Sequence, residues 1–305
     1  YTHNMSILQI VSFNVGGIRN RKKRRSIFNF LKTKNFDIIM LQETHCTPEL
    51  AKQWELEWGG KILFANGRNK SAGVAILIKR KCNFVVSNTV IQPGGRYLLT
   101  NFMINDKYVC TALISTTNAS NNLVEQMSNF SSTDFVVAGD FNTIFSDIMD
   151  KLGGASVHHN RRARERVFDI MSKFDLHEIY RLMHPDKRIF LHFKSPLTGS
   201  RIDFTLVSTS LAETTVLAKI VPSVHSDHQI CFTQIQLENK NCGSGFWKFN
   251  NLLLKHDDFV NTIKGEIEDF KRFNLNGEVS PAIIWDTMKA VIRGICIQYS
   301  SRLRR

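Results

Sequence analysis

Short runs of β-branched and aromatic residues recur along the first 237 positions, with turn residues between them. This pattern predicts strands, at residues 7–13, 36–41, 73–78, 84–91, 96–104, 108–114, 135–138, 202–207, 214–221 and 229–237. Apolar residues at helical spacing predict helices at residues 21–34, 123–130 and 161–174. Because strands outnumber helices and the helices are interspersed, we expect an α/β fold with two packed sheets and helices outside.

The pattern changes after Leu237. Residues 238–245 are polar and contain glycine, as in a linker. Beyond them, apolar stripes predict two amphipathic helices, one through Phe259 and Phe270 and one that begins at Ser280-Pro281. The sequence therefore predicts a first domain over residues 1–238, then a linker and a short helical segment over residues 239–305.

The charge of the chain gives the first indication of a partner. Lys and Arg number 40 and Asp and Glu 27, a formal net charge of +13. This surplus attracts polyanions, namely nucleic acid or an anionic membrane surface, although solubility alone would explain it too. The longest apolar run, Val74–Ile78, is far shorter than the ~20 residues of a membrane span, and no signal-like stretch opens the chain. We expect neither a membrane segment nor secretion.

The six cysteines include no Cys-x-x-Cys pair. Their spacing fits neither a zinc ribbon nor a disulfide framework. It fits small buried residues in a reducing compartment, the cytosol or the nucleus.

Polar and acidic residues stand where several predicted strands end. Asn14 follows the first strand and Glu43 the second, and the further members of this group are Asp140, Asn142, Asp203, Asp227 and His228. Groups at the ends of buried strands are held rigidly and converge on a cleft. Carboxylates with an amide and an imidazole suit a hard cation such as Mg²⁺. Each residue taken singly could equally be a turn residue or a helix cap, so the interpretation depends on their joint order.

That order carries a family resemblance. The motifs are SFNVGGI at residues 12–18, LQETH at 41–45, AGDFN at 138–142, SRIDF at 200–204 and SDH at 226–228. They resemble the endonuclease/exonuclease/phosphatase superfamily, and within it the apurinic-endonuclease-type domain of LINE retrotransposons, over residues 6–237. The segment GFWKFN at 245–250, the helix around Trp285 and the basic end at 302–305 are similar to the segment that lies after the endonuclease in LINE-1-like polyproteins.

The resemblance implies a DNase-I-like, four-layer α/β-sandwich of two packed mixed sheets flanked by helices, with a short helical C-terminal extension. It also implies a Mg²⁺-dependent nuclease, in which Mn²⁺ would substitute. Glu43 would be the main metal ligand, with Asn14 and Asp227 nearby.

The resemblance assigns the chemical steps to further residues. Asp140 would orient and deprotonate the attacking water, and Asn142 would hold Asp140 and the phosphate through its amide. His228 would contact a non-bridging phosphate oxygen. Asp203 would bind the other imidazole nitrogen, which fixes the tautomer and favours the charged form.

One position departs from the family pattern. The family usually carries Tyr in a Tyr-Ala/Val-Pro-Asn stretch, whereas this sequence reads ISTTN at residues 114–118. Asn118 matches the Asn of that motif, but Ser115 stands in place of the Tyr, and its hydroxyl is less acidic than a phenol and reaches less far. Two interpretations are open. Cleavage is reduced or compensated, which we favour because the other core positions are intact, or the domain is catalytically weakened and only binds DNA.

Basic residues near the predicted cleft would contact DNA phosphates rather than read bases. A solvated helix face is the alternative explanation for each of them. The loops before Gly73, around 92–95 and around 194–199 are candidates for choosing the target. The predicted phosphate and DNA contacts are Arg19, Lys22, Ser115, Asn118, Arg161, Arg162 and Ser226.

The implied function is to nick target DNA and leave a 3′-OH that primes reverse transcription during retrotransposition. The partners would be double-stranded DNA, a downstream reverse transcriptase (an RNA-directed DNA polymerase) in the same polyprotein and, indirectly, the element RNA, with no membrane. Synthesis would be cytoplasmic and the site of action nuclear. An apurinic/apyrimidinic repair endonuclease is the nearest alternative, and phosphoinositide phosphatases and sphingomyelinases share the core. The net charge and the Trp247 segment favour nucleic acid.

Overall fold

A computed structural model describes residues 6–303, except 35, 68–71, 81, 83, 105–106, 116–119, 131, 133, 154–160, 196, 238–252, 255 and 276–279. The chain divides into two compact units, Tyr1–Asn241 and Cys242–Arg305. The predicted boundary at 238/239 lies outside the described residues and stays a prediction.

The first sheet of the larger unit has β1 at its centre. Its strand order is β14 (Thr215–Val221), β15 (Ile230–Leu237), β1 (Ser6–Asn14), β2 (Ile38–Gln42), β4 (Val74–Ile78) and β3 (Lys61–Ala65). β1 and β2 are parallel, and the other pairs are antiparallel. In the β1–β15 register, Ser6 lies opposite Leu237 and Ser12 opposite Cys231.

The second sheet repeats this plan. Its order is β10 (Leu176–Glu178), β13 (Asp203–Ser208), β8 (Asp134–Asp140), β7 (Lys107–Ile114), β6 (Tyr97–Ile104) and β5 (Val85–Ile91). Here β7 and β8 are the parallel pair and the remaining pairs are antiparallel. Both sheets are therefore mixed.

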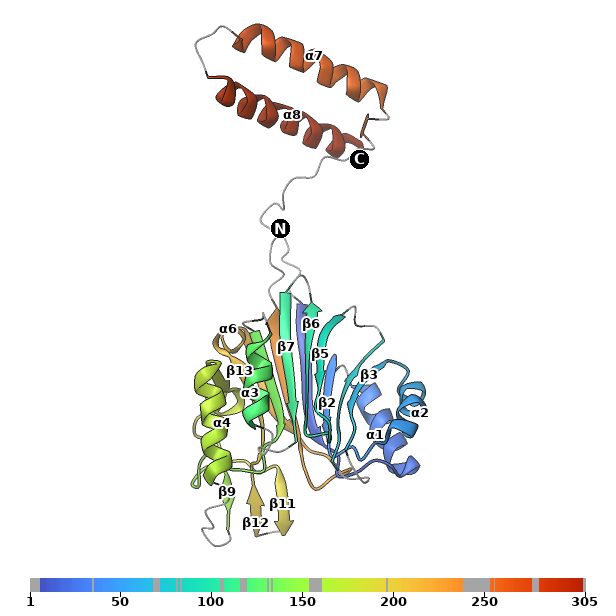
Figure 1. Cartoon of the computed structure of the whole chain (residues 1–305), viewed down its shortest axis with the longest axis vertical. Helices are drawn as coiled ribbons and strands as arrows, with labels where there is room; N and C mark the ends of the chain where they lie inside the picture. Colours follow the sequence, from blue (N-terminus) through green and yellow to red (C-terminus); the bar gives the residue numbers. More distant parts are fainter. Residues whose placement is uncertain are drawn as a thin grey trace. The chain divides into compact units, whose positions relative to one another are not determined.

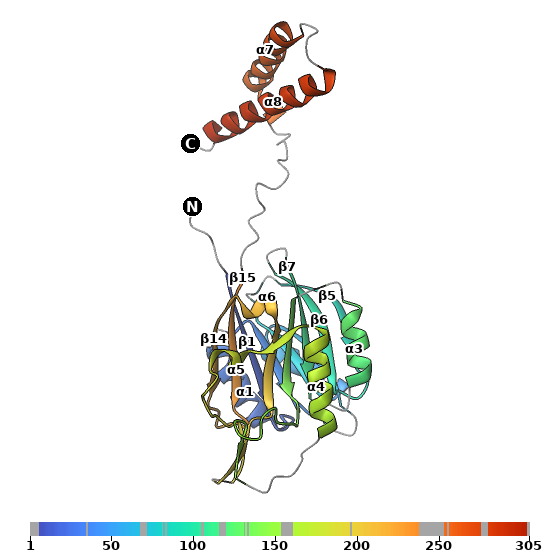
Figure 2. The same cartoon turned by 90° about the vertical axis from the view of Figure 1, so that its left-hand side faces the viewer.

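Alternation along the strands builds the layers. On β1, Leu8 and Ile10 join the core between the sheets, whereas Val11 and Phe13 face outward. The outer face of the first sheet packs on α1 (Arg21–Thr33) and α2 (Pro48–Trp58), and that of the second on α3 (Ser120–Ser128) and α4 (Arg161–Lys173). The two helix pairs flank the sheets on opposite sides (Figures 1 and 2). The expected four-layer α/β-sandwich is confirmed.

A small third sheet lies at one end of the sandwich (Figure 1). It consists of β11 (His192–Ser195), β12 (Thr198–Ser200) and β9 (Lys151–Leu152). An antiparallel bridge between His192 and His228 ties it to the segment before β15. The sequence did not predict these strands, nor α2, β3, β10, α5 (Ile179–Met183) or α6 (Thr209–Ala212), because most are too short to show a period.

The smaller unit consists of α7 (Asp257–Asn274) and α8 (Pro281–Leu303). Leu253, Phe259 and Cys296 are buried in its core. Among the described residues, no helix combines the length and the apolar character that a membrane crossing would require.

Candidate active site

The turn after β1 brings Asn14 next to Asp140. Asn14 is buried, and its Nδ2 donates a hydrogen bond to Oδ2 of Asp140 at 3.0 Å. Its Oδ1 accepts the backbone N–H of Gly16 at 3.0 Å. Lys23 on α1 closes the turn, because its Nζ donates to the carbonyls of Val15 and Gly16 at 2.7 and 2.9 Å. These contacts fix the orientation of the Asn14 amide.

Glu43 lies beside this turn because β2 runs parallel to β1, with Asn14 opposite Gln42. The carbonyl of Glu43 accepts the N–H of Gly17 at 2.7 Å. Glu43 and His45 have φ of 50° and 55°, which costs residues other than glycine conformational strain. A Cβ on Gly17 would lie 2.6 Å from Nδ1 of His45. Glycine is therefore required at position 17 for the His45 ring to pack there.

Asp140 ends β8 with its carboxylate buried, at 2% exposure. Its Oδ1 accepts the backbone N–H of Asn142 at 2.9 Å. This corrects the expectation that the side-chain amide of Asn142 holds Asp140. The amide that holds Asp140 belongs to Asn14, and Asn142 contributes its main chain at a φ of 50°.

Ser115 lies beside Asp140. It follows β7, whose register with β8 sets Ile114 opposite Gly139. Ser115 is buried, and its N–H donates to the carbonyl of Arg96 at 2.9 Å. Residue 118, the predicted Asn118 contact, lies outside the described residues.

Asp203 and His228 form a buried pair. Asp203 begins β13 and lies opposite Asp140 in the antiparallel register. Its Oδ2 is 2.8 Å from Nδ1 of His228. Because a carboxylate accepts hydrogen bonds, Nδ1 carries a proton and Nε2 is the nitrogen left for other contacts. Oδ1 of Asp203 is buried and has no hydrogen-bond partner in the described part of the chain.

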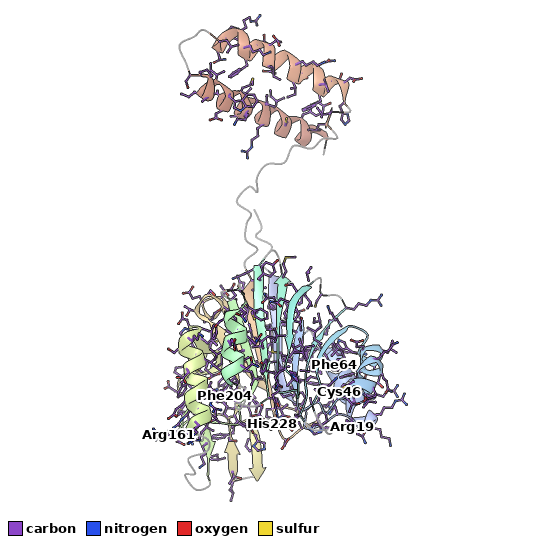
Figure 3. All side chains as sticks on the ribbon, viewed as in Figure 1. Arg19, Cys46, Phe64, Arg161, Phe204 and His228 are labelled. Atoms are coloured by element: carbon purple, nitrogen blue, oxygen red, sulfur yellow. The ribbon has the colours of Figure 1, made fainter. Side chains whose placement is uncertain are left out.

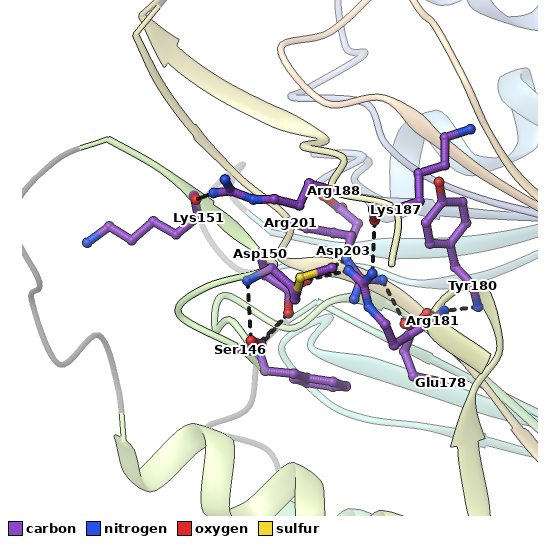
Figure 4. Close-up of polar contacts among 12 residues, drawn as sticks. Ser146, Asp150, Lys151, Glu178, Tyr180, Arg181, Lys187, Arg188, Arg201 and Asp203 are labelled. Carbon is purple, nitrogen blue, oxygen red and sulfur yellow. Dashed lines mark hydrogen bonds and ion pairs between the residues drawn. The ribbon is translucent and has the colours of Figure 1, made fainter. Parts of the chain in front are cut away.

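A buried ion network adjoins Asp203 in the sequence (Figure 4). The guanidinium of Arg201 binds Oδ1 of Asp150 at 2.8 Å and Oε2 of Glu178 at 2.7 Å. Arg181 reaches the same Asp150 oxygen at 3.2 Å. Arg201 is 2% exposed and Asp150 0%. The network joins the start of β13 to α5 and to the segment that enters β9.

Ser226 and Asp227 face the Asn14 turn. A Cβ on Gly16 would lie 3.6 Å from Oγ of Ser226 and 3.8 Å from Oδ1 of Asp227. Ser226 donates to Oδ1 of Asp227 at 3.2 Å and accepts the N–H of His228 at 3.3 Å. Of the three predicted metal ligands, Asn14 belongs to this turn, Asp227 lies close to it, and Glu43 contacts it through its backbone carbonyl.

His192 also belongs to this region, although the sequence did not single it out. Its Nε2 is 3.5 Å from Oδ2 of Asp227, and its ring centroid is 4.6 Å from that of His228. A lone His in a strand-like stretch gives no signal of its own. The backbone bridge from His192 to His228 brings it here.

Burial and charge shift the pKa values of the central groups. Burial, followed by the charge of Asp203, raises the pKa of Asp140 to about 7. Burial alone would lower the pKa of His228, but its hydrogen bond and charge interaction with Asp203 raise it to about 9. Burial opposes ionisation of Asp227, but the charge of His228 and the hydroxyl of Ser226 hold its pKa below the usual range. At neutral pH the site pairs a charged imidazole with a carboxyl near its midpoint.

The predicted basic contacts to DNA are on the surface. Arg19, Lys22, Arg161 and Arg162 are exposed. Arg161 forms an ion pair with Glu165 at 2.8 Å. Figure 3 shows Arg19 and Arg161 on either side of His228, at the same end of the sandwich.

Two groups of described residues could hold a metal ion. The first consists of Asp140, Asp203 and His228, and the second of His192, Asp227 and His228. Within each group the ligand atoms lie within 4.8 Å of one another. Among the residues described, Glu43 belongs to neither group, so its role as the main ligand remains a prediction.

A family model supplies the decisive comparison. The model of the Endonuclease/Exonuclease/phosphatase family matches residues 11–228, which contain the whole site. The chain belongs to the Endonuclease/Exonuclease/phosphatase family. This confirms the family predicted from the five motifs, and with it the expectation of an enzyme that hydrolyses phosphate esters.

Individual relatives agree with this assignment. The chain is 25% identical over 305 residues to the transposon TX1 uncharacterized 149 kDa protein of Xenopus laevis. The alignment covers 96% of this chain but only 23% of that protein. This agrees with the predicted transposon origin. Among solved structures, the AP endonuclease LMAP of Leishmania major has a TM-score of 0.62 at 16% identity, covering 76% of this chain and 88% of that one. The Xenopus laevis APE2 catalytic domain has a TM-score of 0.62 at 19% identity, covering 77% and 95%.

Proposed function

We propose that this chain is a Mg²⁺-dependent endodeoxyribonuclease that nicks double-stranded DNA and leaves a 3′-OH for the priming of reverse transcription. One observation carries the proposal. The Asp203–His228 pair meets Asp140 at the ends of β8 and β13, beside the oxygen-bearing turn at Asn14. A general base, a cation and an anion-binding imidazole would each lower the barrier to hydrolysis of a phosphodiester.

The donors around the Asn14 turn fit a divalent cation of the Mg²⁺ type. Asn14, Glu43 and Asp227 offer carboxylate and amide oxygens, the ligands that hard cations prefer. Asp227 lies close to this turn, since a Cβ on Gly16 would be 3.8 Å from its Oδ1, an ordinary contact distance. When bound, the cation would neutralise charge on the phosphoryl oxygens and assist the departing 3′ oxygen. Mn²⁺ would be accepted by the same ligands.

Asp140 is the proposed general base. Two hydrogen bonds, from Nδ2 of Asn14 and from the N–H of Asn142, hold its two oxygens in a fixed plane. A pKa of about 7 lets it take a proton from water near neutral pH. The exposed amide of Asn142 is available to a phosphate oxygen.

His228 is the proposed phosphate ligand. Asp203 keeps its Nδ1 protonated and its ring charged, so Nε2–H points a positive charge at a non-bridging oxygen. Ser226 fixes the backbone at this point by accepting the His228 N–H. Ser115 and Asn118 would be further phosphate contacts, with Ser115 limiting the rate because it lacks a phenol.

The substrate we propose is a DNA duplex. The net charge of +13 favours a polyanion, and Arg19, Lys22, Arg161 and Arg162 are exposed for phosphate contacts. AP endonucleases are among the similar structures, and the curated relative is a transposon protein. In a LINE-type polyprotein the partners would be a downstream reverse transcriptase and, through it, the element RNA, and the work would take place in the nucleus.

Nicking of supercoiled plasmid tests the proposal. The protein should convert it to open circles with Mg²⁺ but not with EDTA, and Glu43→Ala or Asp140→Ala should reduce the rate by ~10²-fold or more. Asp186→Ala, which removes an exposed carboxylate on the turn after α5, is the matched control and should nick normally. A polymerase should extend the nicks directly if they carry a 3′-OH.

The same assay separates the alternatives. Equal nicking by the unmodified protein and Asp140→Ala would refute the catalytic assignment. A preference for abasic duplex by orders of magnitude would favour a repair endonuclease, and turnover of lipid phosphates another branch of the family. Binding without Mg²⁺-dependent cleavage would identify a DNA-binding module.

A further inference from the structure

The proposed cleavage reaction gives no role to His192, yet this residue sits against two groups that the reaction uses. Its Nε2 lies 3.5 Å from Oδ2 of Asp227, and its ring lies 4.6 Å from that of His228, tilted by 32°. The three side chains offer ligand atoms within 4.8 Å of one another. Two imidazoles and one carboxylate therefore lie close enough together to share one ion.

Each of the three ligands is held by a second contact. Asp203 binds Nδ1 of His228 at 2.8 Å, and Ser226 donates to Oδ1 of Asp227 at 3.2 Å. The backbone of His192 is fixed by its bridge to His228. Such supporting contacts, above all a carboxylate behind a ligating imidazole, are what orient the ligands of metal sites in proteins.

We propose that His192, Asp227 and His228 form a zinc site, and that zinc bound there inhibits phosphodiester cleavage. Two nitrogen donors and one oxygen donor match Zn²⁺, which binds imidazole at about 2.0–2.1 Å and takes three protein ligands with an open fourth position. Mg²⁺ prefers an all-oxygen set. The ring separation of 4.6 Å lets both imidazoles reach a single ion.

The neighbouring group of Asp140, Asp203 and His228 is less suited to zinc. All three residues are buried, and the Asp203 carboxylate already binds the imidazole. The side chain of Asp227, in contrast, is 61% exposed. This exposure lets the ion enter from solvent and leaves room for a water molecule as the fourth ligand.

Inhibition results from the two shared residues, and this part of the inference rests on the proposed function. Zinc takes the lone pair of Nε2 of His228, so the proton on that nitrogen leaves to solvent and the phosphate loses its donor. Zinc also occupies Asp227, which faces the turn at Gly16. His192 contributes a ligand but no step of the cleavage reaction.

Metal binding to the metal-free 305-residue chain tests the site without DNA. Titration with Co²⁺, a spectroscopic substitute for Zn²⁺, should give the absorption bands of a tetrahedral ion, and Zn²⁺ should displace it. His192→Ala should weaken zinc binding by at least ~10-fold. His192→Cys, which restores a zinc ligand, should recover it. His177→Ala is the matched control, because His177 also lies near a carboxylate, 3.8 Å from Asp175, without a second imidazole within reach of it among the described residues.

Plasmid nicking tests the inhibition, with each variant compared with its own zinc-free rate at fixed Mg²⁺. The zinc concentration for half inhibition should rise at least ~10-fold in His192→Ala and stay unchanged in His177→Ala. Equal zinc affinity of His192→Ala and the unmodified protein would overturn the site. Weakened binding with unchanged inhibition would overturn the inhibitory role. A His192-dependent cobalt spectrum in a protein that never nicks would uphold the site and refute the proposed nuclease function instead.

Discussion

Asp140 and Asp203 lie directly opposite each other on β8 and β13, and both are almost completely buried. Burial, and after it the charge of Asp203, opposes ionisation of Asp140. Asp203 forms a hydrogen bond and an ion pair with His228, whereas Asp140 has no such cationic partner in contact among the described residues and has a pKa of about 7. Asp203 therefore influences the protonation of both Asp140, the proposed base, and the imidazole of His228.

A bell-shaped pH profile for nicking is the first prediction. The raised pKa of Asp140 means that its base form is lost as the pH falls through about 7. The raised pKa of His228 means that its charge is present below about 9 and lost above it. Initial rates at saturating Mg²⁺ should peak between these values. A rate that keeps rising above pH 9 would exclude a charged His228 from the reaction.

Asp203→Asn should move that profile as well as lower it. Removing the carboxylate takes away a neighbouring charge that raises the pKa of Asp140 and the partner that raises the pKa of His228. Both limbs should shift to lower pH, and the maximal rate should fall by ~10²-fold because the imidazole loses its orientation. If the rate fell but both limbs of the pH profile stayed at the same pH, Asp203 would have only a structural role.

Ser115→Tyr should raise the nicking rate, because a phenol at this position can bind phosphate or ease departure of the leaving group. Ser115→Phe is the control, since it adds the ring without the hydroxyl and should not accelerate the reaction. Ser115 is buried beside Asp140, so both variants need a thermal melt beside the assay. A slower Tyr variant that melts normally would mean that the site works by different geometry.

Arg162→Gln should weaken DNA binding for all sequences alike. The loss of one phosphate contact should reduce the slope of log affinity against log salt by about 0.9. Arg80→Gln removes an exposed charge near the opposite end of the first sheet, since Ile78 pairs with Ile38 at the start of β2. It should leave the slope unchanged. Equal slopes for both variants would remove α4 from the DNA contact surface.

Arg201→Met should destabilise the fold by ~3–5 kcal/mol, because it leaves the Glu178 carboxylate buried without its cation and Asp150 with Arg181 alone. Urea denaturation measures this loss. Arg161→Met, which breaks an exposed pair with Glu165, should change the midpoint little. A stable Arg201→Met protein would show that Arg181 alone neutralises the cluster.

The residues at strand ends could be predicted because the strands themselves have a clear pattern. The run before Asn14 and the run before Asp140 are apolar and β-branched, so their ends were visible without a structure. The turn geometry was not visible. Nothing in the motif around Asn142 indicated that its backbone, rather than its amide, would hold Asp140.

Residues that depend on long-range pairing could not be predicted, for a physical reason. His192 enters the site through a single bridge to His228, and Asp150 meets Arg201 across 51 positions of the chain. Neither contact has a period or a motif. In α2, Trp54 and Trp58 do share a helix face and pack on Phe28 at 6.3 and 5.6 Å. This spacing was present in the sequence, but the charged residues between them obscured it.

The register of β1 with β15 determines where a further polypeptide can be fused to this domain. Ser6 and Leu237 are neighbours, and Asn14 stands eight residues further along β1, a distance of about 26 Å at the rise of a strand. A polypeptide fused at either residue is therefore attached about that far along the strand from the Asn14 turn. Fusion at these positions thus leaves the residues proposed for cleavage at the far end of β1 from the junction.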